Sequence, residues 1–502
     1  MKKVISLLLA LLLASTGLMA LAESNAVIAD PDVLVVGAGM SGLTTALKVC
    51  EAGGKAILFE QTERVGGSSL YSSSGFIMGI DTQMQKDAGI EDSNELALAD
   101  FQSYAGDRIN LPLAELFCEK SGATVDWLET DLAVDFGDRV PTKGVYQDMS
   151  AARVYTPVGG APTVDAALLA KLEEYVANGQ ATILYNTLVT EVNTDESGKV
   201  VGVTAEDGTA YTAPATVLCT GGYGYNEELL KKYNFTNVQS MAPKTAIGSG
   251  YVFAEELGGG FNGLDYCSNY AGGIQDTGFD FVHAAAVQYP GAIWVNQEGE
   301  RVADEMTADS TVREQSWAQA SDNIVYVLYD ESMIRDDYAV IVNVSGKPVS
   351  DDPARLKEML DQLIADGYAF HADSIEGLAE ATGMDAAKLG ATVEQYNADC
   401  EAGKDSVFGR TDSLIPFNSG SYYAIRTIPY VLMTSGGVNV NEKMQLIKED
   451  GTPIEGIYAA GELVGKNCLL GTGTLGGIGH GVCLTFGTIA AESALEYANG
   501  AQ

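Results

Sequence analysis

Four consecutive apolar residues, Val33 to Val36, are followed by a glycine-rich stretch and then by apolar residues at helical spacing as far as Ala52. A second apolar run follows and ends at Glu60. An all-apolar run is typical of a parallel strand buried on both faces, and apolar residues three and four positions apart indicate a helix. Residues 32–60 are therefore predicted to form a strand, a turn, a helix and a second strand, as in an α/β fold.

The turn after the first strand has the sequence GAGMSG, which contains Gly37, Gly39, Ser41 and Gly42. Glycines at this spacing allow a tight turn and let a pyrophosphate approach the N-terminus of the following helix. Glu60 ends the second strand, where a carboxylate can accept a hydrogen bond from a ribose hydroxyl. The pattern predicts a dinucleotide site, although the acid alone does not choose between NAD and FAD.

Three later segments favour one large dinucleotide over a small one. A flexible loop with Gly66, Gly67, Ser68 and Ser69 follows the second strand and is suited to phosphate and ribityl oxygens. Far downstream, the segments ATVLCTGGYGYN and GIYAAGELVG each end an apolar strand in glycine with a threonine or a glutamate beside it. Several such sites on one chain favour FAD.

The N-terminus has the pattern of a secretory signal peptide over residues 1–22, with two lysines, an apolar run and small residues before Glu23. A membrane anchor is the alternative, but the run is short for a span and is interrupted by Ser15, Thr16 and Gly17. We therefore expect an exported protein without a membrane span after cleavage, in which residues 23–30 form a linker.

Charge and cysteine content restrict the partners. The chain has 29 basic and 68 acidic residues, so loss of Lys2 and Lys3 leaves 27 against 68, a balance of −41. Such acidity makes nucleic acid an unsuitable partner. The seven cysteines form no CxxC metal pair and no CxxCH haem site, so neither a metal nor a haem is expected.

The motifs, taken in order, identify the chain as a relative of the soluble fumarate reductase flavoproteins. They are GAGMSG with Glu60, GGSS, CTGGYGYN, VEQYNADCEAGKDSVFGR, TSGGVNV, YAAGE and GTLGGIGHGVCLTFGTIAAE. The resemblance implies a Rossmann-like α/β FAD-binding domain, formed by residues 31–245 and 432–502, with an inserted α+β capping domain at 246–431. It also implies that hydride from flavin N5 reduces the substrate between the two domains.

The resemblance assigns the FAD contacts residue by residue. They are Gly37, Gly39, Ser41, Gly42, Glu60, Gly66, Gly67, Ser68, Ser69, Val189, Thr220, Gly221, Glu462, Leu475 and Gly476. The helix that begins near Gly476 would direct the positive end of its dipole at the flavin. The serine-rich loop contains no histidine, so non-covalent FAD is expected.

Arg301 stands where the family has a proton-donating arginine, but its expected relay partners are missing. The family's Thr-Glu pair falls on Ala284 and Ala285, and its relay arginine falls on Gln288. A structural role, with Arg301 in a turn paired to Asp304 or Glu305, is therefore an equal alternative. Tyr270 aligns with a substrate-facing histidine and is the second candidate for the proton donor, because a phenol can donate to an enolate.

The dicarboxylate clamp of the family is also altered. Its histidine falls on Leu432 or Met433, and its arginine falls on Thr474. The implied substrate contacts are thus Met433, Gly436 and Thr474. A carboxylate buried without a cation is strongly disfavoured, so fumarate is not the expected substrate.

Other polar and aromatic positions are weaker candidates. A lone histidine is more often packed than catalytic, and clustered tyrosines more often belong to a core. The positions concerned are His283, His480, Tyr422, Tyr423, Arg426 and Tyr430.

The sequence as a whole predicts an exported FAD-dependent oxidoreductase. It would reduce a small substrate with an activated C=C bond, of enone or acrylate type, in respiratory metabolism. The chain contains no haem segment and no FMN domain, so the electrons would come from a separate FMN- or haem-bearing carrier. Two alternatives stay open: a ketosteroid-dehydrogenase-like desaturase, and a flavin electron-transfer or binding subunit without substrate chemistry.

Overall fold

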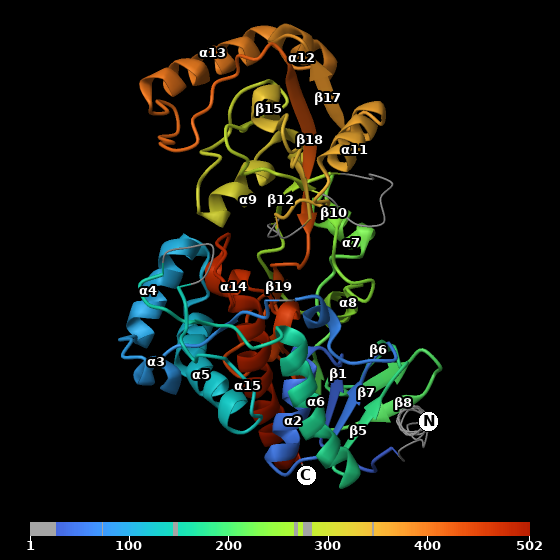
Figure 1. The fold of residues 1–502 in the computed structure, drawn as a ribbon. Helices are drawn as coiled ribbons and strands as arrows, with labels where there is room; N and C mark the ends of the chain where they lie inside the picture. The colour runs from blue at the N-terminus through green and yellow to red at the C-terminus, as the bar shows by residue number, and fades with distance from the viewer. Residues whose placement is uncertain are drawn as a thin grey trace, which may run out of the picture.

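The computed structural model describes residues 27–72, 74–143, 149–265, 270–274, 284–343 and 346–501. They form a base domain, built from both ends of the chain, and a cap domain built from its middle (Figure 1). The predicted signal peptide and residues 23–26 lie outside the described residues, as does His283. Within these ranges, no helix combines the length and the apolar character that a membrane span requires.

The base domain is centred on a six-stranded sheet of order β20-β21-β9-β1-β2-β5. Five of its strands run parallel, and β20 is an antiparallel edge. The strands β1, β2 and β9 are buried at every position, which is why they read as continuous apolar runs. The strands are β1 (Val33–Val36), β2 (Ala56–Phe59), β5 (Ala181–Leu184), β9 (Ala215–Leu218), β20 (Gln445–Ile447) and β21 (Pro453–Ala459).

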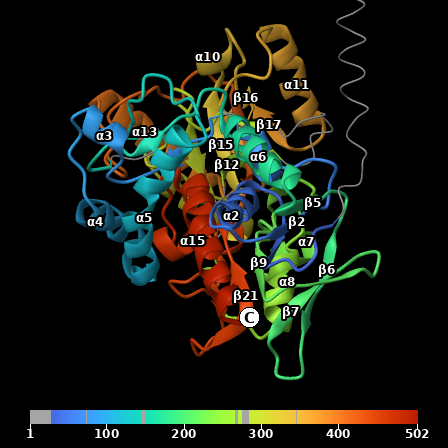
Figure 2. The same cartoon turned by 90° about the horizontal axis from the view of Figure 1, so that it is seen from below.

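Two helices from opposite ends of the chain pack side by side against this sheet. These are α2 (Met40–Glu51) and α15 (Ile478–Ala501), which Figure 2 shows next to each other. The segment predicted as strand, turn, helix and strand is confirmed as β1, α2 and β2. The α/β fold class is confirmed as well.

The remaining base-domain elements are helices around the sheet and small strands on its other side. A three-stranded antiparallel sheet, β6-β7-β8, packs against β9 and β21. These elements are η1 (Gly67–Tyr71), β3 (Ile77–Met78), α3 (Gln83–Asp87), α4 (Asn94–Ala105), η2 (Gly106–Arg108), α5 (Leu111–Thr130), β4 (Val154–Tyr155), α6 (Ala161–Ala177), β6 (Val189–Thr194), β7 (Val200–Ala205), β8 (Ala210–Thr212), α7 (Glu227–Lys232), α8 (Ser249–Glu256), β11 (Phe261–Asn262), β19 (Gly437–Val438), η4 (Gly461–Leu463) and α14 (Asn467–Leu470).

The cap domain is organised around one long strand, β18 (Tyr422–Val431). This strand pairs with β15, β12 and β17, and also with the short β10. Nine of its ten residues are buried, because helices and strands of the cap cover both faces. Figure 1 shows β18 running from the far end of the cap towards the base domain, where the chain re-enters it.

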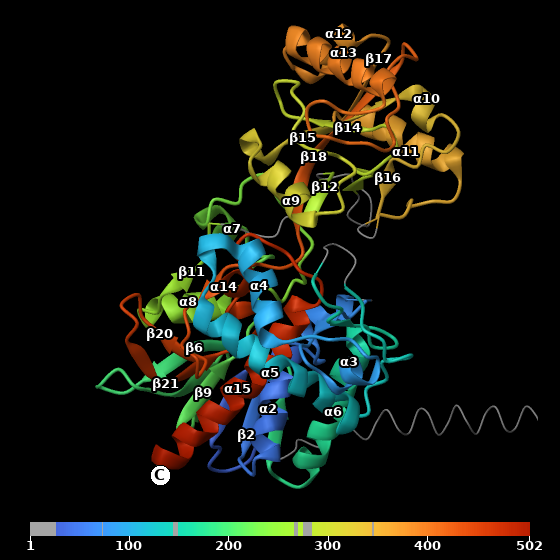
Figure 3. The same ribbon diagram turned by 90° about the vertical axis from the view of Figure 1, so that its left-hand side faces the viewer.

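The other cap elements surround β18 and, in the case of α9, face the base domain (Figure 3). They are β10 (Gln239–Ser240), β12 (Tyr270–Gly273), β13 (Ala284–Ala285), β14 (Ile293–Val295), α9 (Ser310–Ala318), η3 (Ser321–Asn323), β15 (Val325–Asp330), α10 (Glu331–Ile334), β16 (Ile341–Val342), α11 (Pro353–Ala365), β17 (Ala369–Ala372), α12 (Ile375–Thr382) and α13 (Ala386–Ala402).

The packing refines the division of the chain predicted from sequence. Tyr251 and Phe253 of α8 belong to the same apolar core as the base sheet, although the predicted cap begins at residue 246. The separate apolar cores of the cap begin at Ile274. At the other boundary, β18 ends at Val431, next to the predicted return at residue 432. By its packing, the cap begins after β11, and the short β10 joins it from earlier in the chain by pairing with β18.

Candidate functional site: a cofactor pocket continued by a substrate pocket

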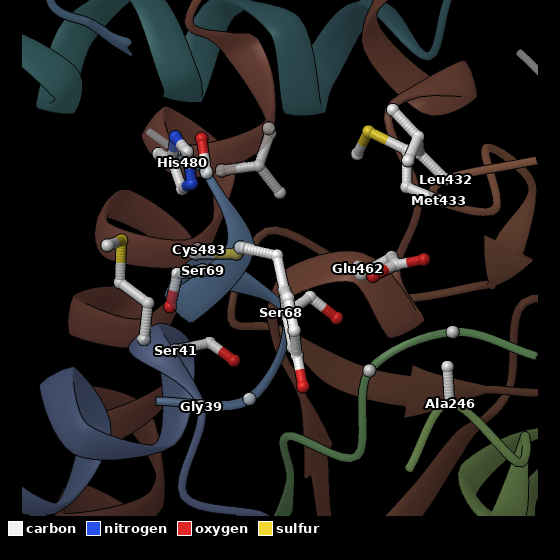
Figure 4. Close-up of a pocket in the computed structure, with 18 of the residues that line it drawn as sticks. Gly39, Ser41, Ser68, Ser69, Ala246, Leu432, Met433, Glu462, His480 and Cys483 are labelled. Carbon is white, nitrogen blue, oxygen red and sulfur yellow. The ribbon is translucent and has the colours of Figure 1, made fainter. Parts of the chain in front are cut away.

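A cavity of about 400 Å³ lies where β1, β2 and β9 end and extends to the underside of the cap. In α/β sheets of this kind, ligands bind outside the carboxyl ends of the strands. Figure 4 shows its wall, to which Gly39, Ser68, Glu462 and His480 contribute from four separate segments. The volume suits a small molecule that is largely enclosed by protein.

The glycine turn before α2 forms one wall of the cavity. A Cβ atom on Gly37 would lie 2.4 Å from the Cys219 carbonyl oxygen, and one on Gly42 would lie 1.8 Å from the Gly37 oxygen. Gly37 also has a φ of +101°, which favours glycine. Gly39 precedes α2 without a side-chain cap, so the first amide groups of the helix are available to an anion.

Glu60 is held at the edge of this turn by three donors. Its Oε1 atom accepts hydrogen bonds from Thr62 N at 2.8 Å and Thr62 Oγ1 at 2.7 Å, and its Oε2 atom accepts one from Ala38 N at 3.3 Å. The side chain lines the cavity and is 6% exposed. A carboxylate fixed in this way can accept further hydrogen bonds from ribose hydroxyls.

The second glycine loop lies against the first. Gly66 and Gly67 have φ angles of +111° and +54°, and Gly66 forms a parallel bridge with Gly39. The loop continues into Ser68 and Ser69, which line the cavity in Figure 4. The two loops thus place backbone amides and hydroxyl groups around one end of the cavity, as phosphate binding requires.

Asp165, which no sequence motif indicates, positions Ser69. Ser69 Oγ lies 2.5 Å from Asp165 Oδ2 and 2.5 Å from the Gly66 carbonyl oxygen. Asp165 lies on α6 and is 2% exposed. Burial raises the pKa of its carboxyl group to about 7, although the hydrogen bond from Ser69 opposes this shift.

Thr220, Gly221 and Glu462 lie together in the cavity wall, as their motifs predict. Thr220 Oγ1 is buried and has no hydrogen-bond partner among the described residues. Glu462 accepts hydrogen bonds from Thr434 N at 2.7 Å and Thr434 Oγ1 at 3.1 Å. Burial raises the pKa of the Glu462 carboxyl group to about 7, so this group can donate as well as accept a hydrogen bond near neutral pH.

The start of α15 closes the cavity from the side of the C-terminus. Leu475, Gly476 and His480 all line it. His480 Nδ1 lies 2.8 Å from the Phe76 carbonyl oxygen, and burial lowers the pKa of the imidazole below its usual range. The ring is therefore neutral near pH 7, with Nδ1 as the donor and Nε2 as an acceptor.

Three predicted contact residues do not line the cavity. Gly42 packs beneath Gly37, and Val189 is buried in β6 opposite Ala205. Gly436 packs against the backbone of Gly263, and its carbonyl oxygen accepts a hydrogen bond from Tyr251. These residues lie behind the residues that line the cavity.

The chemical groups in the cavity wall match those that FAD binding requires. The glycine loops bring backbone groups to the surface of the cavity, and Glu60 and Glu462 supply carboxyl groups. The buried Thr220 hydroxyl has no hydrogen-bond partner among the described residues. Buried polar groups in native proteins are nearly always paired, so an unpaired hydroxyl in a cavity wall indicates a ligand. These residues would hold the pyrophosphate, the ribose and the ribityl chain.

Arg301 lies inside the cap and is not among the residues that line the cavity. Its Nε and Nη2 atoms donate to the two Glu305 carboxylate oxygens at 2.9 and 2.7 Å, and Nη2 also donates to Asp405 at 2.9 Å. Its guanidinium carbon lies 5.1 Å from the centroids of both the Tyr396 and the Phe408 ring. Nη1 has no partner within the described part of the chain.

The ionic cluster around Arg301 is almost completely buried. The Arg301 side chain is 5% exposed, and Arg410 Nη1 donates to the same Glu305 carboxylate at 3.1 Å. Burial alone would lower the pKa of Arg301, but the hydrogen bonds and charges of Glu305 and Asp405 outweigh it and raise this pKa. Of the two structural partners predicted, Asp304 and Glu305, the structure pairs Arg301 with Glu305.

The residues at the positions where the family has its proton relay make contacts that do not involve Arg301. Ala284 and Ala285 form the buried strand β13. Gln288 donates to the Thr307 carbonyl oxygen at 2.7 Å and accepts from Arg313 at 2.5 Å. Neither contact leads to Arg301, so the described residues contain no relay to it through Gln288.

Tyr270 does line the cavity, at the end where the cap covers it. Its ring stacks on that of Tyr430, with centroids 5.2 Å apart and an interplanar angle of 11°. Leu432 and Met433 follow directly after β18 and also line the cavity, where Figure 4 labels both, and Leu432 packs in the same small apolar cluster as Tyr270. Thr474, which is predicted to contact the substrate, lies in the wall.

Lys466 also lines this end and was missed in the sequence. Its Nζ atom donates to the Gly473 carbonyl oxygen at 2.7 Å and to Thr474 Oγ1 at 3.0 Å. The sequence does single out this residue, because Lys466 is the one lysine or arginine between residues 449 and 502. The family motifs place the clamp arginine at Thr474 and have no lysine at the position of Lys466.

Substitution of Arg301 by alanine is expected to destabilise the protein strongly. The change leaves Glu305 and Asp405 buried with one cation fewer, and removal of one partner of a buried pair costs about 3–5 kcal/mol. Urea unfolding followed by circular dichroism measures the loss. Arg355→Ala, which removes an exposed partner of Glu358 on α11, is the matched control and should change stability little. Wild-type stability in Arg301→Ala, combined with loss of activity, would instead make Arg301 catalytic.

Asp165→Asn is expected to change how stability depends on pH. The pKa of Asp165 is about 7 in the fold against 3.8 as the ordinary value, so the folded state binds the extra proton between them. The stability of the flavin-free wild type should therefore fall relative to Asp165→Asn as pH rises from about 4 to about 7, by about 4 kcal/mol in total. Urea unfolding across this range measures the difference, and Asp373→Asn on an exposed loop is the control. Parallel curves for wild type and Asp165→Asn would contradict the raised pKa.

A comparison with protein families matches residues 32–479 to the family described as "FAD binding domain". Among curated proteins, the chain is 31% identical to a fumarate reductase (cytochrome) of Shewanella frigidimarina, over 93% of this chain and 77% of the relative. It is 30% identical to urocanate reductase of Eggerthella lenta, over 93% of this chain and 74% of the relative.

Solved structures show the same fold. The open conformation of a flavocytochrome c3 fumarate reductase is 26% identical, with a TM-score of 0.66, and the match covers 94% of this chain and 79% of that chain. A 3-ketosteroid Δ1-dehydrogenase from Sterolibacterium denitrificans matches 93% of this chain and 99% of its own with a TM-score of 0.73. At 18% identity, that second likeness concerns the fold alone.

These findings agree with the chemistry of the cavity wall. The wall has two glycine loops, the carboxyl groups of Glu60 and Glu462, and the Thr220 hydroxyl, which has no partner among the described residues. They confirm FAD as the cofactor and the resemblance to the fumarate reductase flavoproteins. The chain therefore belongs to the FAD binding domain family, and it is an FAD-dependent oxidoreductase.

Proposed function

We propose that the protein reduces an activated C=C bond in a small molecule that carries less charge than fumarate. The observation that carries the proposal is the composition of the cavity end beneath the cap. Tyr270, Leu432 and Met433 make this end largely apolar and aromatic, and among the described lining residues Lys466 is the one lysine or arginine. Fumarate, urocanate and many other such acceptors share a C=C bond conjugated to another unsaturated group.

A dicarboxylate is a poor match for this cavity. Two carboxylates would require two cationic partners, because an unpaired buried carboxylate is heavily disfavoured. The described wall offers Lys466, while Thr474 and Met433 occupy the positions of the clamp residues in the family, and His480 is neutral. A substrate with one carbonyl or carboxylate group fits this arrangement better.

When bound, FAD supplies the hydride chemistry on which the proposed reaction depends. The chain must then place the substrate beside it, exclude water and deliver one proton to the α-carbon. Tyr270 is the proposed proton donor, because its phenol lies in the cavity wall and its stacking on Tyr430 fixes the ring. A hydroxyl is a suitable donor to a carbon that gains negative charge.

Arg301 has a structural role in this proposal. Its guanidinium is engaged by Glu305 and Asp405 and lies outside the cavity wall. An arginine donates a proton only when a relay restores it, since its pKa is far above neutral. The cluster keeps the cap folded, and the cap in turn covers the substrate end of the cavity.

The proposal also includes export and an external source of electrons. Residues 1–22 have the composition of a signal peptide. An FMN- or haem-bearing carrier is proposed to reduce the bound FAD outside the cytoplasm.

Anaerobic reoxidation of the reduced protein tests the reaction. The FAD-loaded mature protein is reduced with dithionite and mixed in a stopped-flow instrument with fumarate, urocanate, cinnamates and steroid enones. Rapid return of oxidised flavin absorbance is expected with acceptors that carry one charge or none. Tyr270→Phe should slow this phase by about 10²- to 10⁴-fold, the usual contribution of a positioned acid.

Tyr430→Phe is the matched control, since it keeps the stacked ring and changes a side chain outside the cavity wall. Equal rates in wild type and Tyr270→Phe would remove Tyr270 from the mechanism. Reduction of the oxidised flavin by a saturated ketone would instead support the desaturase alternative, and no reaction with any compound would support the electron-transfer alternative.

The start of the exported protein tests the signal peptide. Expression of the full chain in a bacterial host should yield protein outside the cytoplasm with Glu23 as its first residue, because signal peptidases cut after small residues such as Ala20 and Ala22. Mass spectrometry of the intact protein measures this. A chain that retains residues 1–22 and stays in the cytoplasm would contradict export.

A further inference from the structure

A buried carboxyl group and a hydroxyl group meet behind the second glycine loop of the cavity. Asp165 lies near the start of α6, is 2% exposed and does not itself line the cavity. Its Oδ2 atom lies 2.5 Å from Ser69 Oγ, and Ser69 is a lining residue that Figure 4 labels. Ser69 Oγ also lies 2.5 Å from the Gly66 carbonyl oxygen. Ser69 thus stands between Asp165 and the cofactor site.

The two short contacts of Ser69 require two hydrogen atoms. A separation of 2.5 Å is at the short end for hydrogen bonds between oxygen atoms, and each such bond contains one hydrogen. The Ser69 hydroxyl has a single hydrogen, which it can give either to Gly66 or to Asp165. If Asp165 were ionised, one of the two contacts would bring oxygen atoms together without a hydrogen between them. A neutral Asp165 removes the conflict, because it donates to Ser69 while Ser69 donates to Gly66.

The surroundings of Asp165 favour its neutral form as well. Its Oδ1 atom is buried and has no hydrogen-bond partner within the described part of the chain. A buried carboxylate is heavily disfavoured unless charges and hydrogen bonds compensate it, whereas a neutral carboxyl group tolerates such a site better. Burial accordingly raises the pKa of Asp165 to about 7, against the effect of its hydrogen bond with Ser69.

The charged groups near α6 do not compensate Asp165. Helix α6 packs against α2, η1 and β5. The titratable residues of these elements, with those of α6 itself, are Lys48, Cys50, Glu51, Tyr71, Lys171, Glu173, Glu174 and Tyr175. None of them contributes to the raised pKa of Asp165, for which burial is the main cause. On α15, the Cys483 thiol is close enough to respond to the charge of Asp165, but burial raises the pKa of this thiol to about 12 and keeps it neutral.

We propose that Asp165 is a positioning residue for the cofactor: its neutral carboxyl group donates to Ser69 and fixes the Ser69 hydroxyl as an acceptor for a hydroxyl group of FAD. With its hydrogen directed at Gly66, the Ser69 oxygen has one lone pair left for the cavity. That lone pair suits a ribityl or ribose hydroxyl, which can donate, and not an ionised phosphate oxygen, which can only accept. This role concerns the cofactor and is independent of which substrate is reduced.

Ionisation of Asp165 is therefore expected to weaken FAD binding. The carboxylate would take the hydrogen of Ser69, the bond to Gly66 would be lost, and a buried negative charge would stand near an anionic cofactor. Bound FAD should accordingly raise the pKa of Asp165 above its value of about 7 in the flavin-free fold. Below that value the group is neutral with or without FAD, so the affinity stays constant. Above it, FAD binding takes up a proton, and the affinity falls as pH rises.

Dilution of the FAD-loaded protein, followed by the fluorescence of the released flavin, measures the dissociation constant at each pH. In wild type this constant should rise by at least about 10-fold between about pH 6 and about pH 9, which corresponds to a pKa one unit higher with FAD bound. Asp165→Asn keeps a neutral donor to Ser69 and does not titrate, so its rise should be at least about 10-fold smaller. Glu462 also has a pKa of about 7, but it is present in both proteins, and the difference between their curves therefore reports Asp165.

Two further variants separate the hydrogen bond from packing. Asp165→Leu keeps a side chain of similar size without a donor and should weaken FAD at every pH, by about 2- to 10-fold, as expected for loss of one hydrogen bond. Asp165→Asn should instead bind FAD at about pH 6 as tightly as wild type. Glu173→Gln changes an exposed acid on the same helix and should follow the wild-type curve.

The same pH dependence in wild type and Asp165→Asn would overturn the inference. Equal affinities of Asp165→Asn and Asp165→Leu at about pH 6 would overturn it as well, because the donor would then have no effect. If the Asp165 variants do not fold, wild type and Glu462→Gln decide: a rise that persists in Glu462→Gln supports the role of Asp165, and a constant affinity across the pH range contradicts it.

Discussion

The close approach of three backbone segments at the end of β1 is the constraint on which the rest of the structure depends. A Cβ atom on Gly42 would lie 1.8 Å from the Gly37 carbonyl oxygen, and one on Gly37 would lie 2.4 Å from the carbonyl oxygen of Cys219. Only glycine lets α2 start directly against β1 and β9 in this way. The helix N-terminus, the second glycine loop and the Thr220 segment therefore open into one shared cavity.

Charge is distributed in two different ways in the cap. Arg301, Arg410, Glu305 and Asp405 form a cluster within it, in which the members contact one another and none lines the cavity. Glu314, in contrast, contacts the base domain through Thr474 and so reaches the cavity wall. The first arrangement lies within the cap, and the second joins the cap to a residue of the cavity wall.

Local patterns were enough to predict the cofactor half of the molecule. The run from Val33 to Glu60 encodes a buried strand, a glycine turn and a helix through neighbouring residues alone, and the structure has them at nearly the predicted bounds. Local patterns could not predict that Arg301 pairs with Asp405, because the two residues are 104 positions apart along the chain. The same applies to Lys466 and Glu314, which only the meeting of two domains brings together.

The boundary of the cap is a second feature that local patterns do not predict. The segment of α8 was predicted in the cap because the family resemblance implied a capping domain at residues 246–431. Its Tyr251 and Phe253 nevertheless pack into the base core, a matter of tertiary contacts that local spacing does not contain.

The pairing of α2 with α15 has a consequence for how the chain acquires its structure. The base core brings together residues 40–51 and 478–501, so α2, which also contacts α6, lacks its partner α15 until the last segment is made. At roughly 5–20 residues per second, synthesis of the intervening chain takes about 20 to 85 seconds. Contacts between distant segments also slow folding itself. The nascent N-terminal half thus exposes apolar surface for a long time, which is the condition under which chains need chaperones to avoid aggregation.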